Sequence, residues 1–163
     1  MKNLEIERKF LVVPDRWKAL VLPPGIPIVQ GYLCSGDRKV VRIRVSGDQG
    51  FITIKGIPSA GGRPEFEYEI PVAEARDLMK MTEGFPVEKV RYRIGHEGKT
   101  WEVDIFQGLN EGLILAEIEL SELGEIVVNP EWIGEEVTQN YRYYNAYLSK
   151  YPYITWKNNT HKE

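Results

Sequence analysis

The sequence predicts a mainly β protein (α+β), an antiparallel sandwich or barrel with two helices. Charged and apolar residues alternate with period two over most of the chain, which is typical of strands with two different faces. Short alternating segments follow one another, with turn signals rich in glycine and proline between them. The 163 residues, 42% hydrophobic and 28% charged, suffice for one core and exclude a disordered or fibrous chain.

Eight alternating segments are expected to form the strands. The clearest hairpin joins residues 40–46 to 51–55 through the Gly-Asp-Gln-Gly turn at 47–50. A second hairpin turns around Gly95-His96-Glu97-Gly98. In chain order, the expected strands are 4–13, 28–35, 40–46, 51–55, 65–72, 87–94, 100–106 and 113–120.

Two segments favour helices. Residues 73–83 form a short helix, and residues 136–150 place Val137, Tyr141, Tyr144 and Leu148 near helical spacing. The tail 151–163 is polar and expected to be loose. Because neither a repeat nor a linker interrupts the chain, we expect a single domain over residues 1–163.

Composition also restricts the function. A net charge of −3 argues against a general nucleic-acid binder. Cys34 is the only cysteine, so an internal disulfide is excluded, and two histidines are too few for the Cys/His zinc patterns. The sequence has neither a signal peptide nor an apolar run of membrane-spanning length. We therefore expect a soluble cytoplasmic protein without nucleic-acid or membrane partners.

Ionisable residues occupy one face of most predicted strands, because side chains two residues apart share a face. Acids predominate on the first, fifth, seventh and eighth strands, and bases on the third, fourth and sixth. The acids are Glu5, Glu7, Glu65, Glu67, Glu69, Glu102, Asp104, Glu117 and Glu119. The bases are Lys9, Arg42, Arg44, Lys55, Lys89, Arg91 and Arg93.

Two interpretations of this face remain open. In a sandwich, the alternating apolar residues form the core and the charges are solvated surface. In a barrel with the charges inside, arginines and lysines bind phosphates, and clustered carboxylates offer oxygen ligands to Mg²⁺ or Mn²⁺. The ionisable residues on this face of the predicted strands include more acids than bases. A bare polyphosphate would then be repelled, so the second interpretation requires divalent cations.

Several short motifs stand in a fixed order along the chain. Glu5-Ile6-Glu7-Arg8-Lys9 gives E-x-E-x-K near the N-terminus. The others are QGYL at 30–33, R-x-R at 42–44, T-x-K at 53–55, RPEFEYEI at 63–70, K-x-R-Y at 89–92, W-E-x-D at 101–104, A-E-I-E at 116–119, and Val137-Thr138 with Tyr144-Asn145. Over roughly residues 2–150, the set resembles the CYTH domain, or triphosphate tunnel metalloenzyme, family, and its inorganic triphosphatase branch in particular.

The resemblance implies an eight-stranded antiparallel β-barrel, a closed tunnel with a charged interior and covering helices. It implies hydrolysis of inorganic triphosphate, a small-molecule substrate, to pyrophosphate and phosphate with Mg²⁺ or Mn²⁺, two ions when substrate is bound. Nucleotide or thiamine triphosphatase activity, a class IV adenylate cyclase and a non-catalytic polyphosphate-binding module are the alternatives. A homodimer is compatible with an apolar outer wall.

The resemblance also implies roles for individual residues. Lys9 contacts the phosphate near the scissile bond, and Glu65 and Glu67 bind a second metal ion or activate water. The implied phosphate-binding residues are Lys9, Arg42, Arg44, Lys55, Lys89 and Arg91. The implied metal ligands are Glu5, Glu7, Glu102, Asp104, Glu117 and Glu119.

Overall fold

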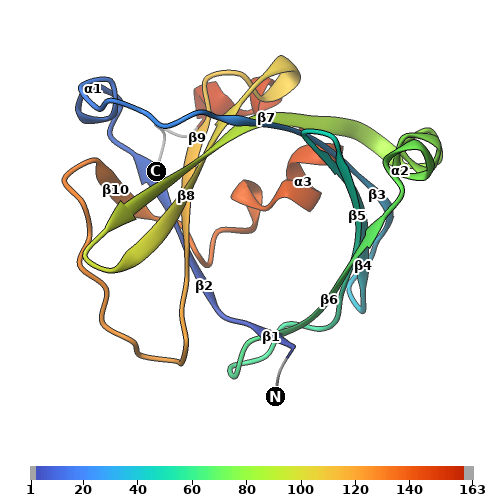
Figure 1. The fold of residues 1–163 in the computed structure, drawn as a ribbon, viewed down its shortest axis with the longest axis horizontal. Coiled ribbons are helices and arrows are strands. Elements are labelled where there is room, and N and C mark those ends of the chain that lie inside the picture. The colour runs from blue at the N-terminus through green and yellow to red at the C-terminus, as the bar shows by residue number, and fades with distance from the viewer. Residues whose placement is uncertain (1–2, 160–163) are drawn as a thin grey trace.

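The computed structural model describes residues 3–159, which form one strongly curved antiparallel sheet with helices on both of its faces (Figure 1). The sheet has ten strands in the order β1-β6-β5-β4-β3-β7-β8-β9-β2-β10. Their bounds are β1 (Leu4–Glu5), β2 (Glu7–Val12), β3 (Ile26–Ser35), β4 (Val40–Ser46), β5 (Gln49–Lys55), β6 (Arg63–Ile70), β7 (Glu83–His96), β8 (Lys99–Phe106), β9 (Ile114–Glu119) and β10 (Ile133–Glu136).

The N-terminal segment brings the two ends of the sheet together. Strands β1 and β2 are separated by Ile6 alone, yet β1 pairs with β6 and β2 pairs with β9. The strands therefore follow a ring in Figure 1, while β1 and β10 remain the two edges of the sheet. The expected closed barrel of eight strands thus differs from the structure, because the chain breaks pairing at Ile6 and adds β10 beside β2.

The two predicted hairpins are confirmed. Strand β4 pairs with β5 from Val40↔Lys55 to Ser46↔Gln49, and β7 pairs with β8 around Glu97-Gly98. Glu97 and Gly98 have φ angles of 48° and 75°, the left-handed conformations that suit a tight hairpin turn. Glycine at the second position adopts this conformation without steric cost.

Short helices cover the outside of the sheet. Helix α1 (Pro14–Trp17) follows β2, and α2 (Val72–Met79) packs on β3, β4 and β5. A Cβ atom added at Gly50 would lie 2.6 Å from the Cβ atom of Ala75, so glycine lets α2 approach the sheet. Within residues 3–159, none of the helices has the length and apolarity needed to cross a membrane.

The C-terminal region differs from the predicted helix at 136–150. It contains the end of β10, the 3₁₀ turn η2 (Tyr141–Tyr143) and the short helix α3 (Asn145–Lys150). The Val137 backbone N–H donates to the Lys9 carbonyl, and the Asn140 side chain accepts from the Arg142 backbone N–H. These bonds direct the backbone away from a continuous helix.

The tail is also more ordered than expected. Residues 153–155 and 157–159 form the 3₁₀ turns η3 (Tyr153–Thr155) and η4 (Lys157–Asn159), and η1 (Gly108–Asn110) lies between β8 and β9. The ring of Trp156 packs edge-on against Tyr143, with centroids 5.4 Å apart. Residues 160–163, the rest of the predicted tail, lie outside the described residues.

Two apolar clusters show which face of the sheet is inside. One cluster covers the outer face of β2, β8 and β9, where Phe10 and Trp101 pack with Trp17 and Trp132. The other lies on the inner face, and its members are Leu11, Val87, Phe106, Leu113, Leu115, Val137, Tyr143, Leu148, Tyr153 and Trp156. Part of the interior is therefore filled by apolar side chains and the C-terminal segment, and the charged residues line the remainder.

Candidate active site

The charged inner face surrounds a cavity of about 950 Å³. Of the fourteen residues with predicted roles, thirteen line it. They are Glu5, Glu7, Lys9, Arg42, Arg44, Lys55, Glu65, Glu67, Lys89, Arg91, Glu102, Glu117 and Glu119. Asp104 lies behind this lining, and only 1% of it is exposed.

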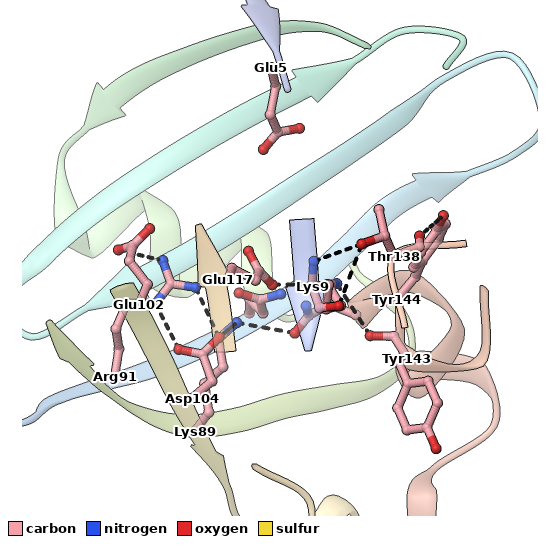
Figure 2. A network of polar contacts seen from close by, with 12 residues as sticks. Glu5, Lys9, Lys89, Arg91, Glu102, Asp104, Glu117, Thr138, Tyr143 and Tyr144 are labelled. Atoms are coloured by element: carbon pink, nitrogen blue, oxygen red, sulfur yellow. Dashed lines mark hydrogen bonds and ion pairs between the residues drawn. The ribbon is translucent and has the colours of Figure 1, made fainter. Parts of the chain in front are cut away.

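Asp104 holds two cations of β7 in place (Figure 2). Arg91 binds it with two nitrogens, Nε to Oδ1 at 2.7 Å and Nη2 to Oδ2 at 2.9 Å. The Lys89 ammonium lies 2.8 Å from Oδ2 and also donates to Asn145 Oδ1 at 3.1 Å. Arg91 Nη1 reaches Glu102 at 3.1 Å. Both Asp104 oxygens are thus engaged by cations rather than directed into the cavity.

Lys9 is buried at the centre of a second network (Figure 2). Its ammonium lies 3.4 Å from Glu117 Oε1 and donates to the Tyr143 carbonyl at 3.3 Å. The Tyr144 ring lies 5.2 Å from the ammonium, and the Thr138 hydroxyl accepts from the Lys9 backbone N–H at 3.0 Å. Nearby carboxylates outweigh the burial penalty and raise the pKa of Lys9, so the side chain is cationic.

The third group of charges lies on β4, β5 and β6. Glu67 accepts hydrogen bonds from Arg42 at 3.3 Å, from Arg44 at 3.1 Å and from the Thr53 hydroxyl at 2.7 Å. These residues come from neighbouring strands in register, with Arg42 opposite Thr53 and Thr53 opposite Glu67. Glu67 therefore fixes the two arginines side by side.

Lys55 joins the three neighbouring strands β5, β6 and β1 at one end of the curved sheet. Its ammonium lies 2.8 Å from Glu5 Oε2 on β1 and 3.0 Å from Glu65 Oε2 on β6. Burial raises the pKa of Glu5 against the opposing attraction of Lys55, and Lys55 lowers the pKa of Glu65 against burial. One lysine thus faces two neighbouring carboxyl groups.

The carboxyl groups of this cavity could bind a divalent cation whose remaining ligands are phosphate oxygens and water. Burial, together with repulsion from the neighbouring carboxylates Glu117 and Glu5, raises the pKa of Glu7 to about 8. Among residues 3–159, no group of three or more His, Cys, Asp or Glu side chains is arranged to hold an ion alone. Mg²⁺ is commonly bound by one or two carboxylates plus waters and substrate phosphates, which suits the pairs Glu7–Glu117 and Glu5–Glu65.

The charge balance of the cavity differs from the expected excess of acid. Its described lining carries nine lysine or arginine side chains and seven carboxylates. Arg63 and Lys99, which were not among the ionisable residues predicted to share one face, line the cavity. Asp104 and Glu69, which were among them, do not. The need for a cation therefore rests on the close carboxyl pairs, and not on the total charge.

The C-terminal segment supplies residues that the strand pattern could not place. Thr138, Tyr144 and Asn145 line the cavity and contact Lys9 or Lys89. The paired motif Val137-Thr138 and Tyr144-Asn145 was the available signal, but a helix was expected there. Arg63 begins the RPEFEYEI motif and Lys99 begins β8, but the sequence predicts no role for either residue.

A curved antiparallel sheet that encloses paired carboxylates among lysines and arginines defines a class of β proteins suited to bind a polyanion together with metal ions. A family model for the CYTH domain matches residues 3–152. The chain belongs to the CYTH domain family.

Relatives with assigned names resemble the chain over nearly its whole length. A protein named inorganic triphosphatase from Acetivibrio thermocellus is 46% identical over 154 residues, which is 94% of this chain and 97% of that protein. Another of that name, from Nitrosomonas europaea, is 40% identical and covers 89% of this chain and 96% of its own. A crystal structure of an inorganic triphosphatase has a TM-score of 0.62 at 35% identity, covering 89% of this chain and 93% of that one.

Proposed function

We propose that the chain is a metal-dependent inorganic triphosphatase, which hydrolyses tripolyphosphate to pyrophosphate and phosphate inside the charged cavity. The observation that carries the proposal is the lining, where carboxyl pairs lie among lysines and arginines directed at one space. The similarity to two proteins named inorganic triphosphatase supports the same reaction. In this proposal, the curved sheet acts as the tunnel wall around the phosphate chain.

The basic residues bind and orient the phosphate chain. Arg42 and Arg44 present guanidinium groups suited to bidentate phosphate contacts, and Glu67 holds them in position. Lys89 and Arg91 contact phosphate while Asp104 fixes them from behind. Lys9 and Lys55 act as point charges. Charges held in place before the reaction stabilise the transition state without further reorganisation.

Acidic residues receive two proposed roles. Glu5 with Glu65, and Glu7 with Glu117, bind Mg²⁺ or Mn²⁺ at two positions, and Glu119 and Glu102 supply further oxygens at the cavity surface. Bound there, a divalent cation would neutralise phosphate charge and lower the pKa of an attacking water. Glu67, whose carboxylate is engaged by two arginines, positions those arginines rather than activating water.

The test is phosphate release from tripolyphosphate, measured with Mg²⁺, with Mn²⁺ and with EDTA, beside ATP and pyrophosphate as substrates. We expect rapid metal-dependent release from tripolyphosphate, little from ATP or pyrophosphate, and loss of all activity in EDTA. The variant Glu5→Gln/Glu7→Gln, purified in the same way, excludes a contaminating phosphatase.

Other outcomes would assign a different function. Preference for ATP would indicate a nucleotide enzyme, and its product, cyclic AMP or ADP, would identify the reaction. Metal-dependent binding without turnover of any substrate would indicate a polyphosphate-binding module. Neither result is compatible with an inorganic triphosphatase.

A second test distinguishes the positioning role proposed for Glu67 from the activation of water that the family resemblance implies. Glu67→Gln weakens its bonds to Arg42 and Arg44 without changing its size, so we expect KM for tripolyphosphate to rise about tenfold. The pH dependence of kcat should keep its shape, because the carboxylate does not transfer a proton. A collapse of kcat with loss of one limb of the pH profile would instead support activation of water by Glu67.

A further inference from the structure

An ion pair on the outer face of the sheet is joined to the cavity by a series of hydrogen bonds. Arg8 lies between Glu7 and Lys9 on β2, so its side chain points to the face opposite theirs. Its guanidinium lies 5.0 Å from the centroid of the Phe10 ring, which belongs to the outer apolar cluster. Arg8 Nε and Nη2 donate to the two carboxylate oxygens of Glu136 at 2.9 and 2.7 Å. Neither Arg8 nor Glu136 belongs to the described lining of the cavity.

Thr138 connects this ion pair to Lys9. Its hydroxyl donates to Glu136 Oε1 at 2.8 Å and accepts from the Lys9 backbone N–H at 3.0 Å. Its carbonyl accepts from the Tyr144 hydroxyl at 2.9 Å, and the Tyr144 ring lies 5.2 Å from the Lys9 ammonium (Figure 2). Thr138 therefore holds Lys9 at the backbone and, through Tyr144, at the charged end. Because Glu136 accepts the single proton of the hydroxyl, Thr138 has none left to donate to a phosphate.

The Lys9 ammonium needs partners other than carboxylates if it is to contact a phosphate. Lysine carries a compact charge on a flexible stem of four carbons, and both Glu117 and Glu7 attract it. The Tyr143 carbonyl, at 3.3 Å, and the Tyr144 ring attract the same ammonium without carrying a charge themselves. These two contacts oppose the collapse of Lys9 onto carboxyl groups that are proposed to bind metal ions.

We propose that Glu136 is a positioning residue for Lys9 and acts through Thr138. Bound to Arg8 on the outer face, Glu136 anchors Thr138, which in turn keeps the Tyr144 ring beside the ammonium. The inference rests on the proposed function, because Lys9 is expected to contact the phosphate near the scissile bond. A displacement of about 1 Å can cost about 100-fold in rate when the displaced group acts in the transition state. Loss of the anchor should therefore lower kcat more than it raises KM.

The test compares Glu136→Ala with the wild type in steady-state hydrolysis of tripolyphosphate with Mg²⁺, at a temperature where both proteins are folded. We expect kcat to fall about tenfold, with KM within about twofold of the wild type. Glu135→Ala, at the exposed neighbouring position on β10, is the matched control and should leave both constants unchanged. An unchanged kcat with a lowered melting temperature would show a merely structural role, and a rise in KM alone would indicate a substrate contact. Either result overturns the inference.

Substitutions of Thr138 test the connection between Glu136 and Lys9. Thr138→Val keeps the shape of the side chain and removes the hydroxyl, so kcat should fall at least as far as in Glu136→Ala. Thr138→Ser keeps the hydroxyl and should retain kcat within about twofold of the wild type. In the Thr138→Val background, Glu136→Ala should cause no further fall, because the connection is already broken. An equal fall in both backgrounds would show that Glu136 does not act through Thr138 and would overturn the inference.

The inference and the proposed function fail in different ways. A wild type that does not hydrolyse tripolyphosphate overturns the proposed function, and crystal structures of the wild type and of Glu136→Ala then test the inference. We expect the Lys9 ammonium in the variant to leave the Tyr144 ring and to approach Glu117, from which it lies 3.4 Å in the wild type. An ammonium still 5.2 Å from the ring centroid in the variant would show that Glu136 does not position Lys9.

Discussion

Glu7→Gln is expected to abolish hydrolysis of tripolyphosphate while making the metal-free protein more stable at alkaline pH. Glu7 is one of a pair of neighbouring carboxyl groups, and a metal ion held by both, as proposed above, would remove their repulsion. Loss of this proposed ligand should reduce activity at least about 100-fold. Mutation of a residue that only orients a metal ligand already lowers metal affinity or activity by about 10–100-fold. The amide retains the volume of the carboxyl group and donates to Glu117.

The stability effect follows from the pKa of Glu7, which burial and the neighbouring carboxylates raise from 4.5 to about 8. Between these values, the folded protein binds more protons than the unfolded chain, so the contribution of Glu7 to stability is complete below pH 4.5 and is lost as the pH rises to about 8. In EDTA, Glu7→Gln should equal the wild type near pH 4 and exceed it at pH 8.5 by on the order of 1–3 kcal/mol.

Urea unfolding followed by tryptophan fluorescence, at both pH values in EDTA, measures this difference. Glu74→Gln on the exposed surface of α2 is the matched control and should change neither activity nor stability. An active Glu7→Gln would remove Glu7 from the metal site. A variant less stable than the wild type at pH 8.5 would show that the carboxyl pair is not repulsive.

The charged interior could be predicted from sequence, although alternation by itself cannot say which face is buried. The acids and bases are sorted by strand, which ordinary solvated faces are not. The structure agrees with this interpretation, because Lys9 and Lys89 are 5% and 2% exposed, whereas Ile54 and Phe66 are 38% and 42% exposed. The charged-surface sandwich would require the opposite.

The C-terminal segment could not be predicted from local pattern. Val137, Tyr143 and Leu148 all contact one apolar cluster. Helical spacing predicts a shared face for Val137 and Leu148, but the residues reach the cluster from separate turns. The backbone between them is set by bonds to Lys9, far away in sequence. Such long-range bonds override local helix propensity, and they also bring Thr138, Tyr144 and Asn145 to the cavity.

The role of Asp104 shows the same limit within the site. The strand alternation correctly predicts that Asp104 lies on the inner face, and the family resemblance implies a metal-ligand role for it, as for the other carboxylates. A residue type cannot reveal whether a carboxylate faces a metal ion or a lysine. The structure places Lys89 and Arg91 on both of its oxygens, which favours a positioning role over ligation.

Asp104→Ala should therefore cost more stability than any exposed charge substitution. The change leaves Lys89 and Arg91 without their shared buried counterion, and breaking a buried pair in this way typically costs about 3–5 kcal/mol. Burial holds the pKa of Lys89 near 8 even with Asp104 present. Without Asp104 the pKa should fall further, so Lys89 would lose its proton near neutral pH and with it the charge that we propose binds phosphate.

Urea unfolding at pH 7 measures the loss, and Asp77→Ala, in an exposed pair with Lys80, is the control expected to show no change. In a Lys89→Met background, Asp104→Ala should cost less, because one of the two stranded cations is gone. The same cost in both backgrounds would mean that the carboxylate does not act through Lys89.

Where Asp104→Ala remains folded, its activity should decline at lower pH than that of the wild type, because Lys89 loses its proton at lower pH. A metal ligand would instead show its effect in the Mg²⁺ concentration needed for half-maximal activity, so the two titrations separate the roles.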